Sequence, residues 1–480
     1  MQPRRNPHLQ LLLPLVVAAA LGAYRLGAKS LWIDEWFSVY LARLDWPAAW
    51  HTMVTGEANM MLYYVLLHYW VGLGLGEAAV RSFSTVVAVA CIIPFYFLGA
   101  HLFGTRHALL ASLLLATNAF FIRYAQEARA YSLVLLLTLT SSLLFVRALD
   151  RPTAGRWVAY AAVSALAIYA HFFAIWVLAV QLLAAMLPLA ARGARLQLLA
   201  AQGAAAALVV PLVVLATRGK PMNALNWVPR PTRETLIAFG RELTGYGGTA
   251  LAILYVVLCA LFLLGNSRPN VPPEARQRLR WSQGFLFAWL AVPVIGTFLF
   301  SRLVTPVFNT RFLIVSLAPL PLLAAGGVQM LRPAWLKLGT LAVLFAFTGW
   351  GLHTWYARMP KEGWRAATAY VVAHSTPGDG VVFDPPFIRG PFEYYLLRSN
   401  SEAIDPVFPS SGWGTWIREF DPTFSAWWTN HPQTLSRVWL ITMEWKSGAV
   451  PEDFVAHYCP NGTEDFDAVQ VRLYRACIPS

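Results

Sequence analysis

The chain has 480 residues, of which 57% are hydrophobic, 14% aromatic and only 13% charged. Because soluble domains carry about a quarter charged residues, this composition excludes an ordinary soluble protein and indicates a polytopic membrane protein. The formal net charge of +13 is the kind of value that a nucleic-acid-binding protein shows. However, the Lys and Arg residues lie between apolar runs and form no single patch with interleaved aromatic residues, so we expect no nucleic-acid partner.

Apolar runs recur from Leu9 to His353. Each has roughly 17 to 25 residues, enough to cross a hydrocarbon core about 30 Å thick, and we predict an α-helical bundle with about eleven transmembrane helices. They lie near residues 9–27, 79–103, 106–122, 130–149, 157–171, 172–191, 196–216, 249–265, 282–300, 312–331 and 335–354. The first run follows Arg4 and Arg5, as in a signal peptide, but lacks a convincing small-residue cleavage site, so we expect it to be retained.

The loops between the predicted helices alternate in charge. With Arg4 and Arg5 inside, every second short loop is also inside, and these loops are basic, as the positive-inside rule requires. They lie at residues 104–106, 147–156, 192–195, 268–280 and 332–337. An odd number of helices then places the C-terminal part on the opposite, extracytoplasmic side of the membrane.

Two adjacent carboxylates, Asp34 and Glu35, follow the first predicted helix in a strongly aromatic setting. Carboxylates favour the positive end of a helix dipole, so capping of a helix start is one explanation. However, acids beside apolar surface are costly without partners or water. Partial desolvation also raises the pKa of a carboxyl group toward the range that a general base needs. We therefore predict that this pair is the catalytic centre.

The first outer segment, residues 28–78, contains two further stretches with one aromatic, apolar face and one polar face. These stretches, 35–44 and 59–70, predict helices that lie in the membrane interface. Their Tyr and Trp residues are typical of an aromatic belt that carries no chemistry. As the alternative to that belt, we take Tyr63 and the nearby Glu57 as candidate substrate-binding residues.

Residues 123–131 place several charged or amide side chains at the outer junction of two apolar runs. Such groups are expensive near hydrocarbon and indicate function. On a helix, Arg123, Gln126 and Glu127 share one face, where Glu127 can pair with Arg123 at i, i+4. Arg129 points elsewhere, and its guanidinium fork suits a phosphate. A purely structural ion-pair cluster is the alternative.

Three more candidates lie at predicted outer positions. His171 sits at a helix–helix junction, where a lone histidine is more often a hydrogen-bonded packing residue. Lys220 lies in the outer segment 218–248, and Arg311 opens a late helix. Basic residues at this depth usually anchor to lipid phosphates in general. Clustered round an acid pair, they would instead hold the phosphate of one particular lipid.

After Met359 acids and turn signals return, which predicts a small α/β domain at residues 358–480 beside a membrane module at 1–357. Its predicted elements, a helix, a strand and further alternating patterns, lie at 363–374, 380–383, 391–398, 438–442 and 468–475. Cys459 and Cys477 both fall in this domain. Since they share a predicted oxidising compartment, we expect them to form a disulfide.

Several stretches together resemble the bacterial C-type glycosyltransferases, relatives of the protein O-mannosyltransferases and of the lipid A aminoarabinose transferase. The resemblance covers nearly the whole chain in order. It is carried by Trp32-Ile33-Asp34-Glu35, Leu62-Tyr63-Tyr64 with Leu66-Leu67-His68, residues 123–133, Tyr169-Ala170-His171-Phe172 and Trp364-Arg365-Ala366-Ala367. It implies the C-type fold and a bacterial inner-membrane location. It also implies transfer of a sugar from a polyprenyl-phosphate carrier to a glycan, lipid or protein acceptor outside the cytoplasm, commonly with inversion.

By this resemblance Asp34 is the base that deprotonates the acceptor, and Glu35 positions acceptor or donor. The remaining candidates would bind the substrate or its phosphate; they are Glu57, Tyr63, Arg123, Gln126, Glu127, Arg129, Tyr131, His171, Lys220 and Arg311. One departure matters. Where many relatives have a His-Pro-Pro run before the Leu-Tyr-Tyr stretch, this chain has Glu57-Ala58-Asn59-Met60-Met61. The acceptor of the better-studied members is therefore not implied.

The sequence contains no Walker loop, no Cys/His group at metal-ligand spacing and no GxSxG motif, which argues against nucleotide-driven and serine-hydrolase chemistry. It leaves open whether a divalent metal assists the carboxylates. The chief alternative is a transporter or flippase of a lipid-linked sugar that forms no bond. Against it, the sequence shows no internal repeat and predicts no paired broken helices. A sensory membrane protein would explain the C-terminal domain but not the acids.

Overall fold

The computed structural model describes residues 7–187, 192–218, 228–265, 272–399, 405–408, 435–444, 450 and 452–477. The chain forms two compact units. The first comprises residues 1–26 and 41–358, and the second comprises residues 27–40 and 359–480. The short segment 27–40 therefore groups with the C-terminal domain, although in sequence it follows the first helix of the bundle.

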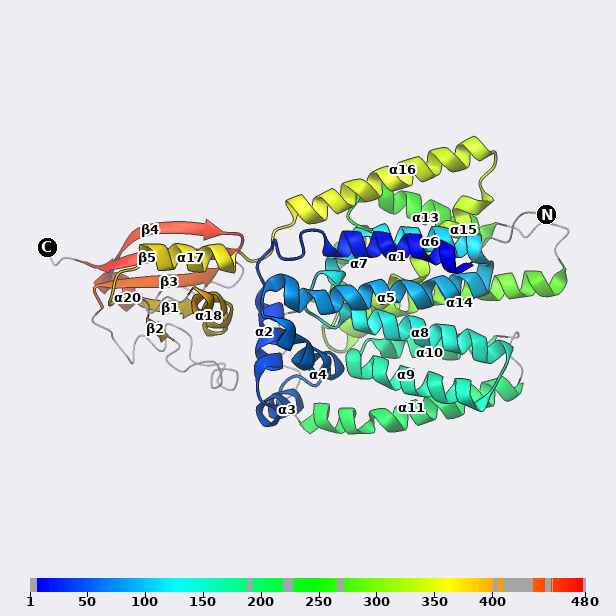
Figure 1. Ribbon diagram of the computed structural model, residues 1–480, viewed down its shortest axis with the longest axis horizontal. Helices are drawn as coiled ribbons and strands as arrows, with labels where there is room; N and C mark the ends of the chain where they lie inside the picture. Colours follow the sequence, from blue (N-terminus) through cyan, green and yellow to red (C-terminus); the bar gives the residue numbers. More distant parts are fainter. Residues whose placement is uncertain are drawn as a thin grey trace. The chain divides into compact units, whose positions relative to one another are not determined.

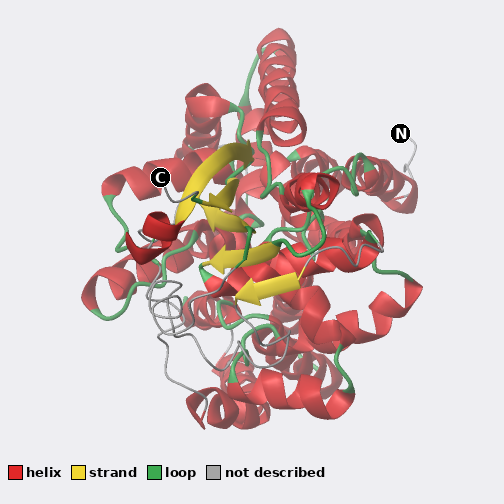
Figure 2. Cartoon of the chain, turned by 90° about the vertical axis from the view of Figure 1, so that its left-hand side faces the viewer, coloured by secondary structure: helices red, strands yellow, loops and turns green. Residues whose placement is uncertain are grey.

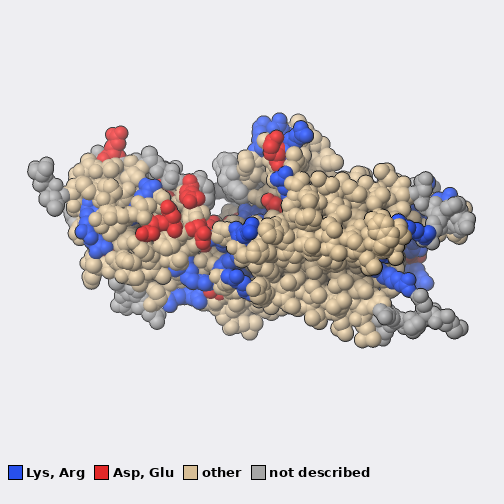
Figure 3. Space-filling view, turned by 90° about the horizontal axis from the view of Figure 1, so that it is seen from above, with Lys and Arg blue, Asp and Glu red and all other residues tan. Residues whose placement is uncertain are grey.

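The first unit is a bundle of helices, and its long helices run side by side (Figure 1). They are α1 (Pro7–Ala23), α5 (Glu77–Phe103), α6 (Thr105–Thr117), α7 (Ala119–Ala125), α8 (Tyr131–Asp150), α9 (Ala154–Ala170), α10 (Ala174–Met186), α11 (Arg192–Arg218), α12 (Arg233–Leu243), α13 (Gly248–Leu264), α14 (Pro273–Leu303), α15 (Pro319–Met330) and α16 (Ala334–His353). Figure 3 shows a broad uncharged face along this bundle, with Lys and Arg side chains gathered toward its ends. Such a face is what lipid contact requires.

Each predicted transmembrane segment overlaps a helix or, at residues 106–122 and 312–331, a bent pair of helices. Among the described residues, 5 helices are long and apolar enough to cross a membrane, or up to 8 if each bent helix pair is one span. Several predicted spans are shorter helices, such as α10 (Ala174–Met186). The structure therefore confirms a multi-pass membrane protein, without confirming about eleven crossings.

One bend matters for the site. Helices α6 and α7 are inclined by 62° across Asn118. The Asn118 side chain caps α7 by accepting from the Phe121 amide at 3.1 Å, and it donates to the Leu243 carbonyl at 3.0 Å. An amide side chain of this kind satisfies backbone groups that a helix break would leave unpaired. The break ends the long apolar run early, so the polar residues after α7 emerge at one end of the bundle.

Two short helices of the bundle unit, α3 (Trp46–Thr55) and α4 (Met61–Trp70), fill the first outer segment, together with the 3₁₀ turn η1 (Val71–Leu73). Helix α4 matches the predicted helix at 59–70, whereas α3 was not predicted. Asp45 starts α3 by accepting from the Ala48 amide at 2.9 Å, and Trp46, Trp50 and Tyr69 are exposed. Exposed aromatic side chains of this kind suit a membrane interface.

Three loops that the sequence predicts on one side of the membrane meet in the structure. The Asp150 carboxylate at the end of α8 lies 2.8 Å from His101 Nε2 of α5 and 2.6 Å from an Arg278 nitrogen of α14. Charged residues from three separate helix ends thus form one cluster, which we call the inner-loop cluster. The shared location agrees with the predicted alternation of loops.

The second unit contains a five-stranded sheet in the order β2-β1-β3-β5-β4, seen in Figure 2 as strands lying side by side. In this order the first three strands are parallel to one another, and β5 is antiparallel to both of its neighbours, β3 and β4. The strands are β1 (Gly380–Asp384), β2 (Asp405–Phe408), β3 (Arg437–Met443), β4 (Tyr458–Phe466) and β5 (Val469–Ala476). The helices are α17 (Trp364–His374), α18 (Arg389–Arg398) and α20 (Glu452–His457), while α2 (Ile33–Arg43) begins in this unit and ends in the bundle.

The sheet has its own core, in which Val382, Val438 and Leu440 pack against Phe454 and Tyr474. The sheet combines parallel central strands with an antiparallel edge. Its combination with helices fits the α/β domain that the alternating helix and strand patterns predict. The structure joins Cys459 of β4 to Cys477 just after β5 in a disulfide with Cα atoms 5.2 Å apart. This is the pairing that the shared compartment of the two cysteines predicts.

Candidate functional site

The two predicted catalytic carboxylates occupy the first turn of α2 and differ in their surroundings. The Glu35 side chain is fully buried, and its Oε2 lies 2.9 Å from Lys361 Nζ, whose side chain is 8% exposed. Glu35 Oε2 also accepts from the Trp32 amide at 3.5 Å, which is helix capping. Asp34 keeps partial exposure. The capping explanation therefore applies to Glu35.

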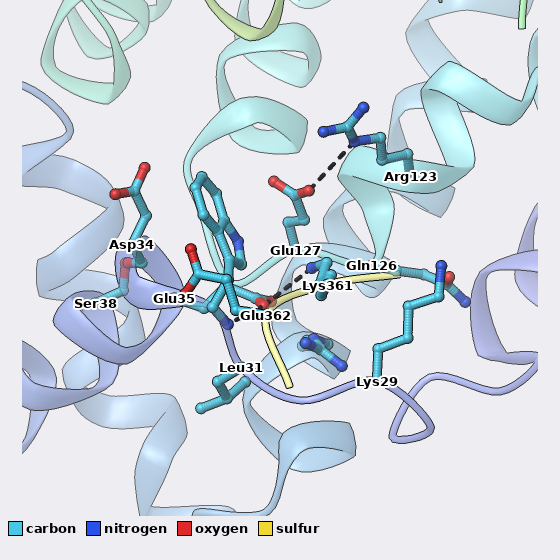
Figure 4. Close-up of polar contacts among 12 residues, drawn as sticks. Lys29, Leu31, Asp34, Glu35, Ser38, Arg123, Gln126, Glu127, Lys361 and Glu362 are labelled. Carbon is cyan, nitrogen blue, oxygen red and sulfur yellow. Dashed lines mark hydrogen bonds and ion pairs between the residues drawn. The ribbon is translucent and has the colours of Figure 1, made fainter. Parts of the chain in front are cut away.

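A third carboxylate, Glu362, joins this group, and sequence reasoning missed it. Figure 4 shows it beside Glu35 and Lys361. Glu362 Oε2 accepts from the Ile33 amide at 3.0 Å and from Trp364 Nε1 at 2.6 Å. Burial raises the pKa of Glu362 to about 7; the negative charge of Asp34 raises it as well, and the two hydrogen bonds and Lys361 lower it. Glu362 therefore titrates near neutral pH.

Other contacts within the second unit fix the segment before α2. The Leu31 amide donates to the Tyr395 hydroxyl at 2.8 Å, and Lys29 Nζ donates to the Met359 carbonyl at 2.7 Å. The indole of Trp36 lies where a Cβ on Gly390 would collide with it. The chain therefore needs glycine at position 390, and the carboxylate segment is built into the C-terminal domain by close packing.

In the bundle, Arg123 and Glu127 form the predicted i, i+4 pair, with Arg123 Nε 3.6 Å from Glu127 Oε1 (Figure 4). The Arg123 guanidinium donates to the Tyr246 hydroxyl at 2.8 Å and lies over the rings of Tyr246 and Trp355. The Glu127 side chain is only 2% exposed. Arg123 is thus held by a carboxylate, a phenol and aromatic faces; its side chain is 28% exposed, whereas that of Glu127 is buried.

Arg129 points to a different partner. It is 6% exposed, and its guanidinium donates to the hydroxyl of the fully buried Tyr64 at 3.2 Å. The Tyr64 hydroxyl in turn donates to Glu57 Oε1 at 3.5 Å. The predicted Tyr63 instead shares a hydrogen bond with Ser84 Oγ at 2.9 Å. Tyr64, which the sequence analysis did not select, therefore links Glu57 to Arg129.

His171 is 1% exposed and packs against Tyr131 and Phe312. Its Nδ1 accepts from the Phe173 amide at 3.2 Å, so the neutral ring carries its proton on Nε2. Within the described part of the chain, Nε2 has no hydrogen-bond partner. The positive charges of Arg129 and Arg311 both act on this ring. The structure thus gathers two arginines and a buried N–H donor.

The segment Glu57-Ala58-Asn59-Met60-Met61, which departs from the family pattern, also contacts the residues around His171. Asn59 Oδ1 accepts from the Phe172 amide at 3.1 Å, next to His171. Met60 has a left-handed backbone with φ of 69°, which a residue other than glycine adopts only when its surroundings impose it. One short segment therefore contacts both groups. Glu57 accepts from Tyr64, the partner of Arg129, and Asn59 accepts from the backbone next to His171. We call Glu57, Tyr64, Arg129, His171 and Arg311 the arginine–histidine cluster.

Two other predicted site residues, Gln126 and Lys220, are not part of the arginine–histidine cluster. Gln126 donates to the carbonyls of Gly22 and Tyr24 at 2.9 and 2.8 Å, and its oxygen accepts from Trp355 Nε1 at 2.8 Å. The nitrogen and the oxygen of the Gln126 side-chain amide are therefore both hydrogen-bonded within the protein. Lys220 lies outside the described residues. Among the described residues, no group of three or more His, Cys, Asp or Glu side chains is placed to hold a metal ion.

These geometries indicate what each of the two groups of residues can do chemically. The buried Arg129, together with Arg311 and a neutral N–H donor, suits a phosphate, because charge-assisted bonds are strongest away from water. A partly exposed carboxylate beside a second carboxylate suits proton transfer. The arginine–histidine cluster belongs to the bundle unit, and the carboxylates belong to the second unit.

No protein-family model and no curated protein sequence matches the chain. In structure the chain is similar to ArnT from Cupriavidus metallidurans bound to undecaprenyl phosphate, with a TM-score of 0.61 and 13% identity over 96% of this chain and 97% of that chain. The apo state of ArnT gives a TM-score of 0.56 at 13% identity over the same shares. AglB, the Archaeoglobus fulgidus oligosaccharyltransferase with an inhibitory peptide and a dolichol-phosphate, gives 0.48 at 13% identity over 80% of this chain and 63% of that chain.

Of these structures, the two of ArnT have TM-scores above 0.5. At that similarity over nearly the full length of both chains, this chain has the ArnT fold. The fold implied by the resemblance to the C-type glycosyltransferases is therefore confirmed.

Proposed function

We propose that this protein is a glycosyltransferase that moves a sugar from a polyprenyl-phosphate carrier to an acceptor on the extracytoplasmic side of the bacterial inner membrane. The observation that carries the proposal is the arginine–histidine cluster, in which Arg129, Arg311 and the His171 N–H gather at one end of a bundle with the ArnT fold. The ArnT structure of that fold is bound to undecaprenyl phosphate. A polyprenyl phosphate supplies both the anion for the cluster and the lipid tail for the bundle.

In the proposed reaction the cluster binds the phosphate that links sugar to lipid. As the bond between the anomeric carbon and the phosphate oxygen breaks, its electron pair stays on that oxygen. The arginines stabilise the growing negative charge, because preorganised donors in a dry site act most strongly where charge develops. Arg123 and Glu127 support this end of the bundle through their ion pair.

Asp34 is the proposed base. It takes the proton from the acceptor nucleophile, which forms its new bond to the anomeric carbon on the face opposite the leaving phosphate, so the configuration inverts. The partial exposure of Asp34 supports this role, since a base must be reachable by the acceptor. Glu35, buried and paired with Lys361, supports the helix start instead.

The proposal places the C-terminal domain outside the cytoplasm. The Cys459–Cys477 disulfide supports this side, because disulfides form and persist in oxidising compartments. The basic inner-loop cluster at Arg278 and the exposed Arg332 support the same orientation through the positive-inside rule. A cysteine introduced near each face and labelled with a membrane-impermeant reagent tests it.

The test of function is reconstitution of the whole protein in lipid nanodiscs with a panel of radiolabelled undecaprenyl-phosphate sugars and a cell-envelope acceptor extract. We expect label to move from lipid to a product that mild acid, which cleaves sugar phosphates, does not release. Arg129→Gln should lose this activity, whereas Arg278→Gln, which changes an exposed arginine of the inner-loop cluster, should keep it. Movement of intact donor across vesicle membranes with no new product would indicate a transporter and would overturn the proposal.

A further inference from the structure

We infer that Lys361 and Glu362 are positioning residues that give the two adjacent carboxylates separate roles: they fix Glu35 as a structural anion and aim Asp34 as the reacting carboxylate. The inference deepens the proposed function and rests on it. It concerns groups that all lie in the second unit.

The Glu35–Lys361 pair is the first observation. Glu35 is fully buried and Lys361 nearly so, and their charged atoms are 2.9 Å apart. Two buried opposite charges compensate each other, whereas either one alone would be an uncompensated charge away from water. The residues lie 326 positions apart in sequence, so the pair joins the start of α2 to the segment that leads into α17. The Glu35 carboxylate is therefore occupied by the ion pair that joins these two segments.

Glu362 is the second observation. It accepts from the amide of Ile33, the first residue of α2, where a helix has backbone donors without intrahelical partners. The same oxygen accepts from Trp364 Nε1, and Trp364 is fully buried. Glu362 thus connects the amide just before Asp34 to a rigid residue at the start of α17. Rotation of α2 about its axis, which would re-aim Asp34, breaks this bond.

Charge is the third observation. The charged groups that act on Glu362 are Asp34 and Lys361, and its hydrogen-bond donors are Ile33 and Trp364. Because the pKa of Glu362 is raised to about 7, the group is neutral below that pH and anionic above it. Above that pH a second negative charge stands beside Asp34. The ionised Glu362 also accepts more strongly from the Ile33 amide and Trp364 Nε1, which fix the start of α2, so transfer should increase as the pH rises through this region.

The first experiment is a double-mutant cycle with Glu35→Gln and Lys361→Met, using the initial rate and the KM for the lipid-linked sugar. Each single variant should lower kcat by at least about tenfold with little change in KM, because it removes the opposite charge that lies 2.9 Å from a buried charge. The double variant should recover most of that loss. If it stays as inactive as Glu35→Gln alone, Glu35 acts on the substrate and the inference is wrong.

The second experiment compares Glu362→Gln with Glu362→Ala. Glutamine keeps an oxygen that can accept from Ile33 and Trp364 but cannot ionise. We expect Glu362→Gln to keep activity and to lose the inflection of kcat/KM near pH 7, and Glu362→Ala to lose activity. An unchanged inflection in Glu362→Gln would overturn the role of Glu362.

Hydrogen exchange separates these outcomes from simple unfolding. Peptides covering residues 31–40 should exchange faster in Lys361→Met and Glu362→Ala than in the wild-type protein, while peptides from β5 (Val469–Ala476) stay protected. Equal protection in all variants would contradict a positioning role. If the wild-type protein transfers no sugar, the proposed function fails; if it transfers sugar but the cycle shows no coupling, only this inference fails.

Discussion

Two clusters of arginine and carboxylate side chains lie at helix ends of the bundle, and they differ in burial. At the Arg123–Glu127 pair the Glu127 side chain is 2% exposed, and neighbouring Arg129 is also buried. In the inner-loop cluster the side chains of Arg278 and Asp150 are 48% and 36% exposed. Sequence alone gives both clusters a similar appearance. Burial separates them, since charge is kept away from water only where it performs a task or has a close partner.

This difference separates the arginines that we expect to mark topology from those that we propose to bind phosphate. Exposed ion pairs contribute little to stability and are screened by salt, so the inner-loop cluster mainly marks one side of the membrane. The arginine–histidine cluster holds two arginines around one buried histidine donor, an arrangement that topology does not require. The following changes test the comparison, in order of expected effect.

Arg129→Ala should have the largest effect. It removes a buried cation from the proposed phosphate site, and loss of one donor that stabilises developing charge lowers kcat by about 10²–10³-fold. Sugar transfer under saturating donor measures this loss, and binding of polyprenyl phosphate should weaken too. The matched control is Arg278→Ala. Equal losses in the two variants would mean that burial does not distinguish the clusters.

Tyr64→Phe should have an intermediate effect. It removes the hydroxyl between Arg129 and Glu57 while keeping the ring. Hydrogen bonds to charged groups contribute about 1.5–3 kcal/mol, so a roughly tenfold or greater loss of kcat/KM is expected. Tyr63→Phe on the same helix is the control and should leave transfer nearly unchanged. A larger effect at position 63 would reverse the assignment.

Asp150→Asn should have the smallest effect. The carboxylate lies at an exposed helix end, where such pairs contribute about 0–1 kcal/mol. Thermal unfolding in detergent should shift by a few degrees at most, and raising the salt concentration should shrink the difference from wild type. Sugar transfer should be unchanged. Loss of transfer in this variant would show that the inner-loop cluster takes part in function.

Much of this site was predictable because charge is rare in the chain. Asp34, Glu35 and the cluster from Arg123 to Arg129 stand out as polar groups among apolar residues, and the structure places Arg129, His171 and Arg311 together. Their closeness could not be read from spacing, because they come from three separate parts of the sequence. Family resemblance, not periodicity, suggested that they act together.

Other residues could not be predicted, for physical reasons. Tyr63 and Tyr64 are adjacent and chemically alike, and only the packing of α4 decides which one faces Arg129. Lys361 and Glu362 resemble a charged linker after the last helix, because their partners on α2 are far away in sequence. Strand β4 (Tyr458–Phe466) was missed because its residues are mostly exposed and polar, so it lacks the alternation that marks a half-buried strand.

The central claim is that Asp34 is the base of a sugar transfer from polyprenyl phosphate. The most direct measurement is single-turnover transfer by Asp34→Asn in nanodiscs, with lipid binding followed by native mass spectrometry in the same preparation. We predict that bound polyprenyl-phosphate sugar is retained while the transfer rate falls by about 10²–10⁴-fold, as loss of a general base requires. Transfer at the wild-type rate with lipid bound would contradict the claim.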